Sequence, residues 1–241
     1  MKISVVVPAF NEARLLAGSL GSIRAAMEAF DRRGWASDLI VCDNNSTDRT
    51  AAIARAAGAR VVFEPVNQIS RARNTGIAGA GGDWIFFVDA DSHPTVELFS
   101  EAADAIAAGR CLAGGSTVVY ANPPRGVALA VGLWNALSRI MRWAAGSFIF
   151  CEAAAFRKAG GFREALYASE EVDLFRRLKR MARRERRTIV ILHCHPLLTS
   201  DRKVRLYGWP RLFGFMLKTV VSRGRTLRSR EDCFAWYDGE R

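Results

Sequence analysis

Two carboxylates spaced one residue apart, Asp89 and Asp91, come directly after the apolar run at residues 84–88. Five apolar residues in a row indicate a strand buried on both faces, and open α/β folds bind their ligands at the carboxyl ends of such strands. Carboxylates at a buried strand end need a counter-charge, because desolvating an anion is costly. Magnesium and manganese favour one or two carboxylates together with phosphate oxygens. The pattern therefore predicts a site for a metal-bound phosphorylated molecule.

Two polar loops follow the first two predicted strands, at residues 8–12 (P-A-F-N-E) and 43–48 (D-N-N-S-T-D). Either loop alone could be ordinary helix-start and turn chemistry. Because neighbouring parallel strands end at one crevice, we expect the loops to lie together, where Asp43 could accept a hydrogen bond from a ring N–H of a base. The first loop lacks the glycines with which Rossmann and P-loop folds bind phosphate, so both classes are excluded.

A second pair of carboxylates, Glu170 and Glu171, opens the helix predicted from about Ser169. The helix dipole favours anions in a first turn, and an acidic first turn is common in any helix. In the context of Asp89 and Asp91, this pair becomes a candidate source of the base that removes a proton from a hydroxyl group.

The strand predicted at residues 188–192 leads into two further candidates. His193 and His195 alternate along the chain, and alternate residues of a strand face opposite sides, so the imidazoles are not expected to share one metal ion. In the following run T-S-D-R-K (199–203), Arg202 could reach a diphosphate, and an exposed basic loop is the equal alternative.

Strands and helices alternate along the first part of the chain. Such spacing indicates a doubly wound, mostly parallel α/β sheet with right-handed crossovers and helices on both faces. The predicted strands cover residues 3–7, 39–42, 60–63, 84–88, 111–120, 148–151 and 188–192. The first predicted helices cover residues 15–30, an Ala-rich stretch that ends at Gly58, and a short stretch that begins at about Ser70. Further helices are predicted from Thr95 to near Gly109, over residues 126–143, over residues 153–159, and from about Ser169 onward.

The chain of 241 residues has a formal net charge of +11, which indicates anionic partners. The basic run at 176–187 lacks interleaved aromatic residues, which argues against nucleic acid. Scattered cysteines without C-x-x-C spacing fit a reducing compartment, and no apolar stretch approaches the ~20 residues of a membrane span. We expect a cytoplasmic protein. The segment 206–218 could lie at the anionic inner face of a membrane, with a core-packed helix as the alternative.

The motifs V-V-V-P-A-F-N-E, C-D-N-N-S-T-D, A-R-N-T-G (72–76), D-A-D and E-E-V-D-L resemble family 2 glycosyltransferases, which have the GT-A fold. They occur in the family's order, closely over the first half of the chain and more diffusely to about Arg205. The resemblance implies a single GT-A domain over 1–241. It would comprise a nucleotide-sugar-binding half (about 1–92), an acceptor-binding half (about 93–205) and a basic, apolar C-terminal segment (206–241).

The resemblance also implies roles for individual residues. Asp91 would bind the metal directly, with Asp89 near the ribose and the metal. Glu171 would be the catalytic base, supported by Glu170, although the family has an E-D pair there. The residues expected to bind the nucleotide-sugar are Pro8, Phe10, Asn11 and Glu12 at the nucleoside, Asp43 at the base, and Arg73 and Arg202 near the diphosphate.

The predicted function is that of an inverting, metal-dependent glycosyltransferase with manganese or magnesium as cofactor. It would move a sugar from a nucleotide-diphospho-sugar, UDP-sugar first and GDP-sugar next, to a hydroxyl group of a saccharide or lipid-linked acceptor. A nucleotidyltransferase is one alternative, but it should carry a glycine-rich basic loop after the first strand. The other is a non-catalytic module that binds a nucleotide-sugar or a membrane.

Overall fold

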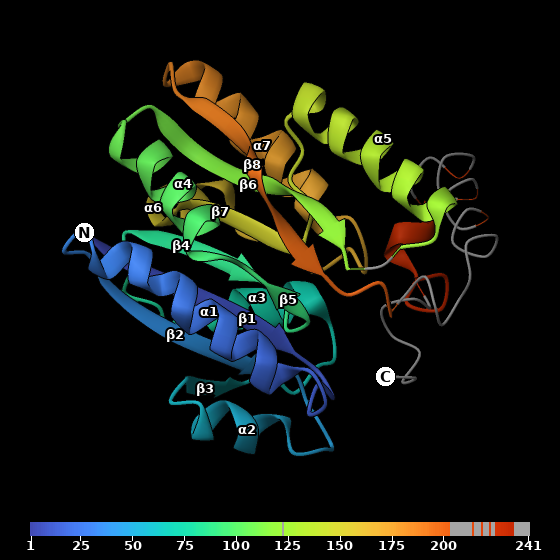
Figure 1. The fold of residues 1–241 in the computed structure, drawn as a ribbon. Helices are drawn as coiled ribbons and strands as arrows, with labels where there is room; N and C mark the ends of the chain where they lie inside the picture. The colour runs from blue at the N-terminus through green and yellow to red at the C-terminus, as the bar shows by residue number, and fades with distance from the viewer. Residues whose placement is uncertain (122, 203–213, 215–217, 219–221, 223–224, 234–241) are drawn as a thin grey trace.

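Eight strands in the described part of the chain form one twisted sheet, and helices cover both of its faces (Figure 1). The computed structural model describes residues 1–121, 123–202, 214, 218, 222 and 225–233. The strand order is β3-β2-β1-β4-β7-β6-β8-β5. In this described part of the chain, no helix is both long and apolar enough to cross a membrane.

Most strands of the sheet run in one direction. The first four are parallel neighbours: β1 (Lys2–Ala9), β2 (Ala36–Asp43), β3 (Arg60–Phe63) and β4 (Trp84–Val88). The others are β5 (Ser92–His93), β6 (Cys111–Tyr120), β7 (Phe148–Glu152) and β8 (Thr188–Thr199). Only β7, beside β4 and β6, and β5, beside β8, are antiparallel to their neighbours among the described strands. The predicted mostly parallel sheet is therefore confirmed. We did not predict β5, because two residues are too few to show a period.

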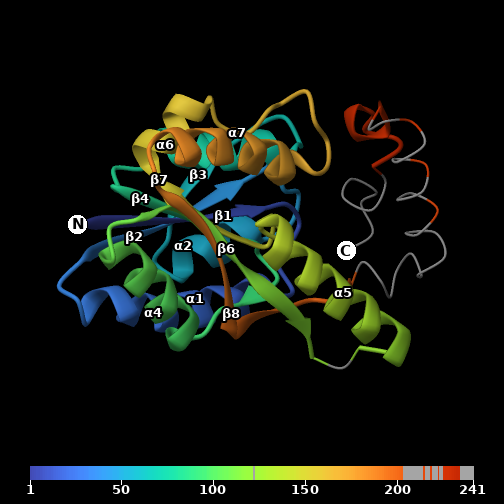
Figure 2. The same cartoon turned by 90° about the horizontal axis from the view of Figure 1, so that it is seen from above.

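Helices form a layer on each side of the sheet (Figure 2). One side carries α1 (Leu16–Asp31), α2 (Thr50–Ala56) and α4 (Val96–Ala107), and the other α3 (Ile69–Ala78), α6 (Ala153–Ala159) and α7 (Glu170–Arg184). The long helix α5 (Arg125–Met141) packs along β6, where the Asn135 side chain bonds to the backbone N–H and C=O of Val118. A short 3₁₀ helix, Arg225–Arg228, follows late in the chain.

Side-chain alternation along β4 gives the sheet two cores. Phe86 packs against Phe30 of α1 with ring centroids 5.1 Å apart, whereas Phe87 packs against Phe162 on the opposite face at 5.0 Å. Every residue of β4 is buried, as predicted for a strand covered on both sides. This burial holds the carboxyl end of β4 in place, and with it the loop that carries Asp89 and Asp91.

A bulge changes the geometry of β8 beyond the predicted strand end. Ser116 of β6 pairs with Leu192 and Val118 with Leu197, so residues 193–196 have no regular partners on β6. His193 and His195 are both exposed there. The alternation expected at these histidines is therefore interrupted. After the bulge β8 continues to Thr199, and the predicted membrane segment 206–218 lies almost wholly outside the described residues.

Candidate active site

A cavity of about 430 Å³ lies beside the carboxyl end of β4. Four carboxylates line it: Asp89 and Asp91 from the loop after β4, and Glu170 and Glu171 from the first turn of α7. Arg73 of α3 lines the same cavity. The structure thus brings both predicted carboxylate pairs into one site, although they lie far apart in the sequence.

Arg73 joins the two carboxylate pairs at the cavity. Its Nη1 donates to Glu170 Oε1 at 2.6 Å, and its Nη2 donates to Asp89 Oδ1 at 2.9 Å and to the carbonyl of Gly146 at 2.7 Å. The Arg73 side chain is only 1% exposed. Burial alone would lower its pKa, but Asp89 and Glu170 outweigh that effect and raise it. Arg73 is therefore a fixed cation that positions carboxylates, and its predicted contact with a diphosphate stays a prediction.

Glu171 lies at the cavity with protein packed around it. This burial, together with the neighbouring charge of Glu170, raises the pKa of Glu171 to about 8, although Arg73 acts in the opposite direction. The preceding Ser169 has a φ of 59°, a left-handed conformation that side chains other than glycine seldom adopt. Strained backbone of this kind is common at functional sites. A carboxylate with a raised pKa is a stronger base, as a proton acceptor for a hydroxyl group requires.

Arg202 connects the end of the described β8 region to the first loop. Its Nη1 and Nη2 donate to the two carboxylate oxygens of Glu12, each at 2.8 Å, and Nη2 lies 3.5 Å from Asp91 Oδ2. Glu12 is buried. The predicted diphosphate ligand Arg202 is thus beside the predicted metal ligand Asp91. The pKa of the nearby Tyr120 is raised, mainly because the side chain is buried and further by the charges of Asp91 and Asp201.

Hydrogen bonds tie the two predicted nucleoside loops to each other. Asn11 receives a bond from the Thr47 N–H at its Oδ1 (2.8 Å) and donates its own N–H to Ser46 Oγ (3.0 Å). The Glu12 N–H donates to Thr50 Oγ1 at 2.8 Å. Asn11 and Asn45 have φ values of 51° and 65°, which asparagine tolerates better than most residues. The expected convergence of these loops is therefore present, and Asn11 supports it structurally.

The remaining nucleoside candidates lie at the ends of β1 and β2. Pro8 pairs in register with Cys42, and the neighbouring Ala9 with Asp43, whose Oδ1 accepts from the Ser46 N–H at 3.1 Å. Pro8, Phe10 and Asp43 are not among the residues that line the 430 Å³ cavity. The structure therefore places the nucleoside candidates beside the carboxylate group, with Glu12 and Arg202 as the link, and their contact with a base stays a prediction.

Sequence reasoning missed the apolar lining of the cavity. Val127, Val131 and Trp134 of α5 line it. The only available signal was the apolar character of this helix on much of its surface. It also missed Asn44, whose side chain donates to the carbonyls of Glu64 (3.2 Å) and Val66 (2.6 Å), and so anchors the second loop.

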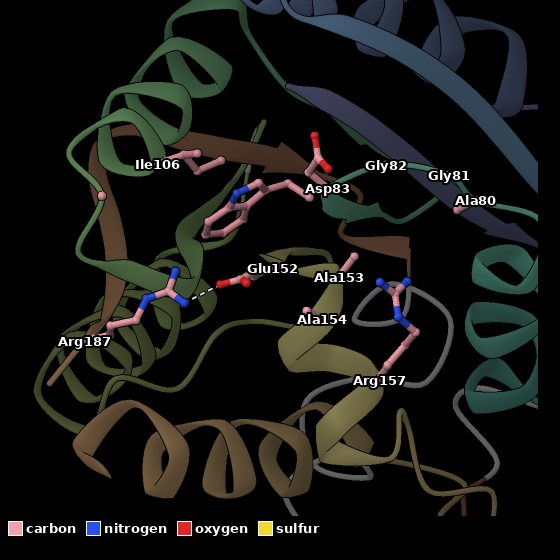
Figure 3. A pocket seen from close by; sticks show the side chains of 12 residues that line it. Ala80, Gly81, Gly82, Asp83, Ile106, Glu152, Ala153, Ala154, Arg157 and Arg187 are labelled. Atoms are coloured by element: carbon pink, nitrogen blue, oxygen red, sulfur yellow. Dashed lines mark hydrogen bonds and ion pairs between the residues drawn. The ribbon is translucent and has the colours of Figure 1, made fainter. Parts of the chain in front are cut away.

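A second cavity, of about 600 Å³, lies at the amino end of β4 (Figure 3). Three of its charged side chains have protein partners: Arg187 is paired with Glu152, and Asp83 accepts from the Lys2 N–H at 2.8 Å. Ligands of open α/β sheets bind at the carboxyl ends of strands. We therefore assign the candidate active site to the smaller cavity.

Asp89 and Asp91 fit a divalent cation by their chemistry and position. Their side chains are partly accessible at the cavity. Hard divalent cations take oxygen ligands, and magnesium uses one or two carboxylates together with substrate phosphates. The 3.5 Å approach of the Arg202 guanidinium to Asp91 shows that this carboxylate already attracts a cation.

Comparison with known proteins agrees with this arrangement. The profile described as Glycosyl transferase family 2 matches residues 4–159. A TPR repeat-containing protein of Synechococcus elongatus is 37% identical over 101 residues, which are 42% of this chain and 23% of that protein. An uncharacterized glycosyltransferase of Mycobacterium tuberculosis is 36% identical over 89 residues, 37% of this chain and 36% of its own length. The match thus spans well under half of each relative.

Solved structures share the fold. A Pyrobaculum calidifontis mannosyltransferase, solved with GDP-Man and Mn²⁺, superposes with a TM-score of 0.71 at 19% identity, covering 92% of this chain and 63% of that one. Staphylococcus aureus TarS residues 1–349 superpose with a TM-score of 0.65 at 21% identity, covering 98% and 68%. The α/β sheet is that of GT-A glycosyltransferases. Since the family profile matches more than half of its length, the chain belongs to glycosyl transferase family 2.

Proposed function

We propose that this protein is an inverting, metal-dependent glycosyltransferase that moves a sugar from a nucleotide-diphospho-sugar to an acceptor hydroxyl group. The observation that carries the proposal is the gathering of Asp89, Asp91, Glu170 and Glu171 around Arg73 in one cavity. Carboxylates held in fixed positions at one cavity suit a reaction that needs both an anion-binding metal and a base.

The donor would lie across the ends of β1, β2 and β4. Relatives of the same fold support both nucleotides: TarS has been solved with UDP-GlcNAc, and the Pyrobaculum mannosyltransferase with GDP-Man. We favour a UDP-sugar, with Asp43 accepting from the base, Pro8, Phe10 and Glu12 at the nucleoside, and Arg202 at the diphosphate. Apart from Arg202, this assignment keeps the donor in residues 1–92 and the acceptor in 93–205.

Asp91, with Asp89, would hold a manganese or magnesium ion, and the ion would supply charge that neutralises the leaving diphosphate. Arg202 is close enough to Asp91 to add a second positive charge at the same place. The buried Arg73 fixes the side chain of Asp89, so the carboxylate does not have to reorganise when the donor arrives.

Glu171 would remove the proton from the acceptor hydroxyl. The hydroxyl oxygen then attacks the anomeric carbon from the face opposite the diphosphate, so a single displacement inverts the configuration, with the oxocarbenium character known from glycosidases. Glu170 would keep its position through the 2.6 Å bond from Arg73 and sustain the raised pKa of Glu171 by its charge.

The acceptor side of the cavity is apolar. Val127, Val131 and Trp134 line it together with the carboxylates. Apolar walls with a few fixed polar groups are typical of sites for ligands that carry apolar parts. We therefore favour a lipid-linked saccharide as the acceptor, with a plain saccharide next.

Glu171→Gln tests the proposal. The substitution keeps the shape of the side chain but removes its basicity, so donor binding measured by thermal shift with UDP and manganese should persist while turnover collapses. Glu164→Gln is the matched control, because Glu164 pairs with Arg71 on the surface and should leave turnover unchanged. Normal turnover in Glu171→Gln would exclude this residue as the base. Donor binding without turnover in the wild type, across UDP- and GDP-sugars, would favour a non-catalytic binding module.

A further inference from the structure

The outward side of α5 exposes a continuous apolar stripe. Leu129, Leu133 and Ile140 are 77%, 71% and 78% exposed, and Leu137 is exposed between them. Their spacing of three and four residues places them on one face of the helix. The residues of α5 that line the active-site cavity, such as Val131, lie on the opposite face. The helix is thus apolar on two faces. The inner face lines the active-site cavity, which explains its apolar character, whereas the cavity does not explain the apolar outer face.

Basic side chains gather at the C-terminal end of this stripe. Arg176 and Lys179 of α7 stack over the Trp143 ring, with centroid distances of 5.8 and 5.6 Å, and Lys179 donates to the carbonyl of Met141. Burial, followed by the charges of Arg183 and Arg142, lowers the pKa of Lys179. These cations therefore lie close enough to repel each other.

The same cluster carries little compensating negative charge. The sequence of α5 contains no Asp or Glu. Within the described residues, Arg142, Arg176 and Arg183 form no ion pair with a carboxylate. Between α5 and β8 lies a hollow of about 440 Å³ lined by Arg139, Arg142 and His193. A concave basic site beside exposed leucines fits an anionic headgroup whose acyl chains lie against the leucines.

We propose that the outer face of α5 (Leu129, Leu133, Leu137 and Ile140), with the basic hollow at Arg139 and Arg142, binds the surface of an anionic lipid bilayer. Charge favours a bilayer over a second copy of this chain, because a symmetric interface would bring two uncompensated basic clusters together. The C-terminal segment 206–241 also carries more Lys and Arg than Asp and Glu, so it adds to the positive charge of the chain. On the membrane, the inner face of α5 would admit a lipid-linked acceptor; this last step rests on the proposed function, whereas the binding does not.

Vesicle co-sedimentation of the full chain, without donor or acceptor, tests the binding. We expect binding to vesicles of phosphatidylglycerol and phosphatidylcholine, at least tenfold weaker binding to phosphatidylcholine alone, and a loss of binding as salt is raised. The double variant Leu129→Gln/Leu133→Gln and the charge variant Arg139→Gln/Arg142→Gln should each weaken binding at least tenfold. Both pairs are exposed, so the variants should fold, which circular dichroism checks.

Phe63→Gln is the matched control, because Phe63 is also an exposed apolar residue, 58% accessible at β3, away from α5. It should bind vesicles as the wild type does. Absence of binding to anionic vesicles, or wild-type binding by both double variants, would overturn the proposal. If the wild type instead self-associates without binding vesicles, and Leu129→Gln/Leu133→Gln abolishes that self-association, the face would be assigned to contact with a second copy of the chain. Donor binding, followed separately with UDP, distinguishes a failure of this surface from a failure of the proposed activity.

Discussion

Arg73 and Glu170 form a buried ion pair of 2.6 Å in which neither side chain is more than 4% exposed. The same guanidinium bonds to Asp89 on its other branch. One cation thus fixes a carboxylate from each of the two carboxylate pairs that the sequence analysis identified as candidate site residues. The planar fork of arginine makes this possible, since lysine offers a point charge and cannot bridge two directions with the same geometry.

Replacing Arg73 should destabilise the protein severely. Arg73→Met leaves Glu170 and Asp89 without their shared cation, and breaking a buried pair in this way costs about 3–5 kcal/mol. Arg71→Met is the control: Arg71 pairs with Glu164 on the surface, and exposed pairs contribute up to about 1 kcal/mol. Urea unfolding measures both. Equal losses in the two variants would show that the buried network is not the stabilising element.

Stability should fall as pH rises because of Glu171. Its pKa in the folded chain is about 8, above the ordinary 4.5, so between these values the folded state binds more protons than the unfolded state and loses stability with rising pH. Glu171→Gln removes this effect. In metal-free buffer we expect the variant to gain roughly 1–3 kcal/mol relative to wild type between pH 5 and pH 8.5. A difference between variant and wild type that does not change with pH would contradict the raised pKa.

Glu12 and Arg202 should be energetically coupled. They form a two-bond pair at 2.8 Å that joins the first loop to residues after β8. A double-mutant cycle with Glu12→Gln and Arg202→Met should give a coupling of about 1–3 kcal/mol in unfolding free energy, because contacting charged residues do not behave additively. The exposed pair Lys158 and Glu185 provides the control cycle, with a coupling near zero expected. A Glu12–Arg202 coupling as small as that of the control pair would show that this ion pair does not link the first loop to the residues after β8.

Replacing Trp134 should weaken the binding of the acceptor and leave the binding of the donor unchanged. It belongs to the apolar lining of the cavity. Trp134→Ala should raise the KM for a lipid-linked acceptor by about tenfold, in line with the loss of part of an apolar pocket, while the KM for the donor stays within twofold. Steady-state kinetics with each substrate varied in turn provides the measurement. A larger effect on the donor would place the sugar, and not the acceptor, against α5.

The sequence predicted the elements better than the side-chain partners. The run at 84–88 was recognisable as a doubly buried strand, and the bounds of β3, β4 and β6 agree with the prediction, because local apolar patterns specify them. The bulge at 193–196 was not predictable, since it depends on the register with β6, which is set by tertiary packing.

The side-chain partners of Arg73 could not be predicted from the sequence pattern alone. The resemblance carried by A-R-N-T-G implied that Arg73 lies near a diphosphate, which stays a prediction, but it gave no sign of the bonds from Arg73 to Asp89, Glu170 and Gly146. Those partners are distant in sequence, so only the folded chain brings them together. The apolar face of α5 was visible in the sequence, but which side lines the cavity depends on how the helix packs on β6.

Isothermal titration of UDP into the wild type and Asp91→Asn, each with manganese and with EDTA, tests the central claim most directly. We expect wild-type binding that requires manganese and weakens at least tenfold in Asp91→Asn, with Asp104→Asn, a surface carboxylate paired with Arg33, binding as the wild type does. UDP affinity that is the same in EDTA as in manganese, or unchanged in Asp91→Asn, would contradict a metal-bridged diphosphate at this site.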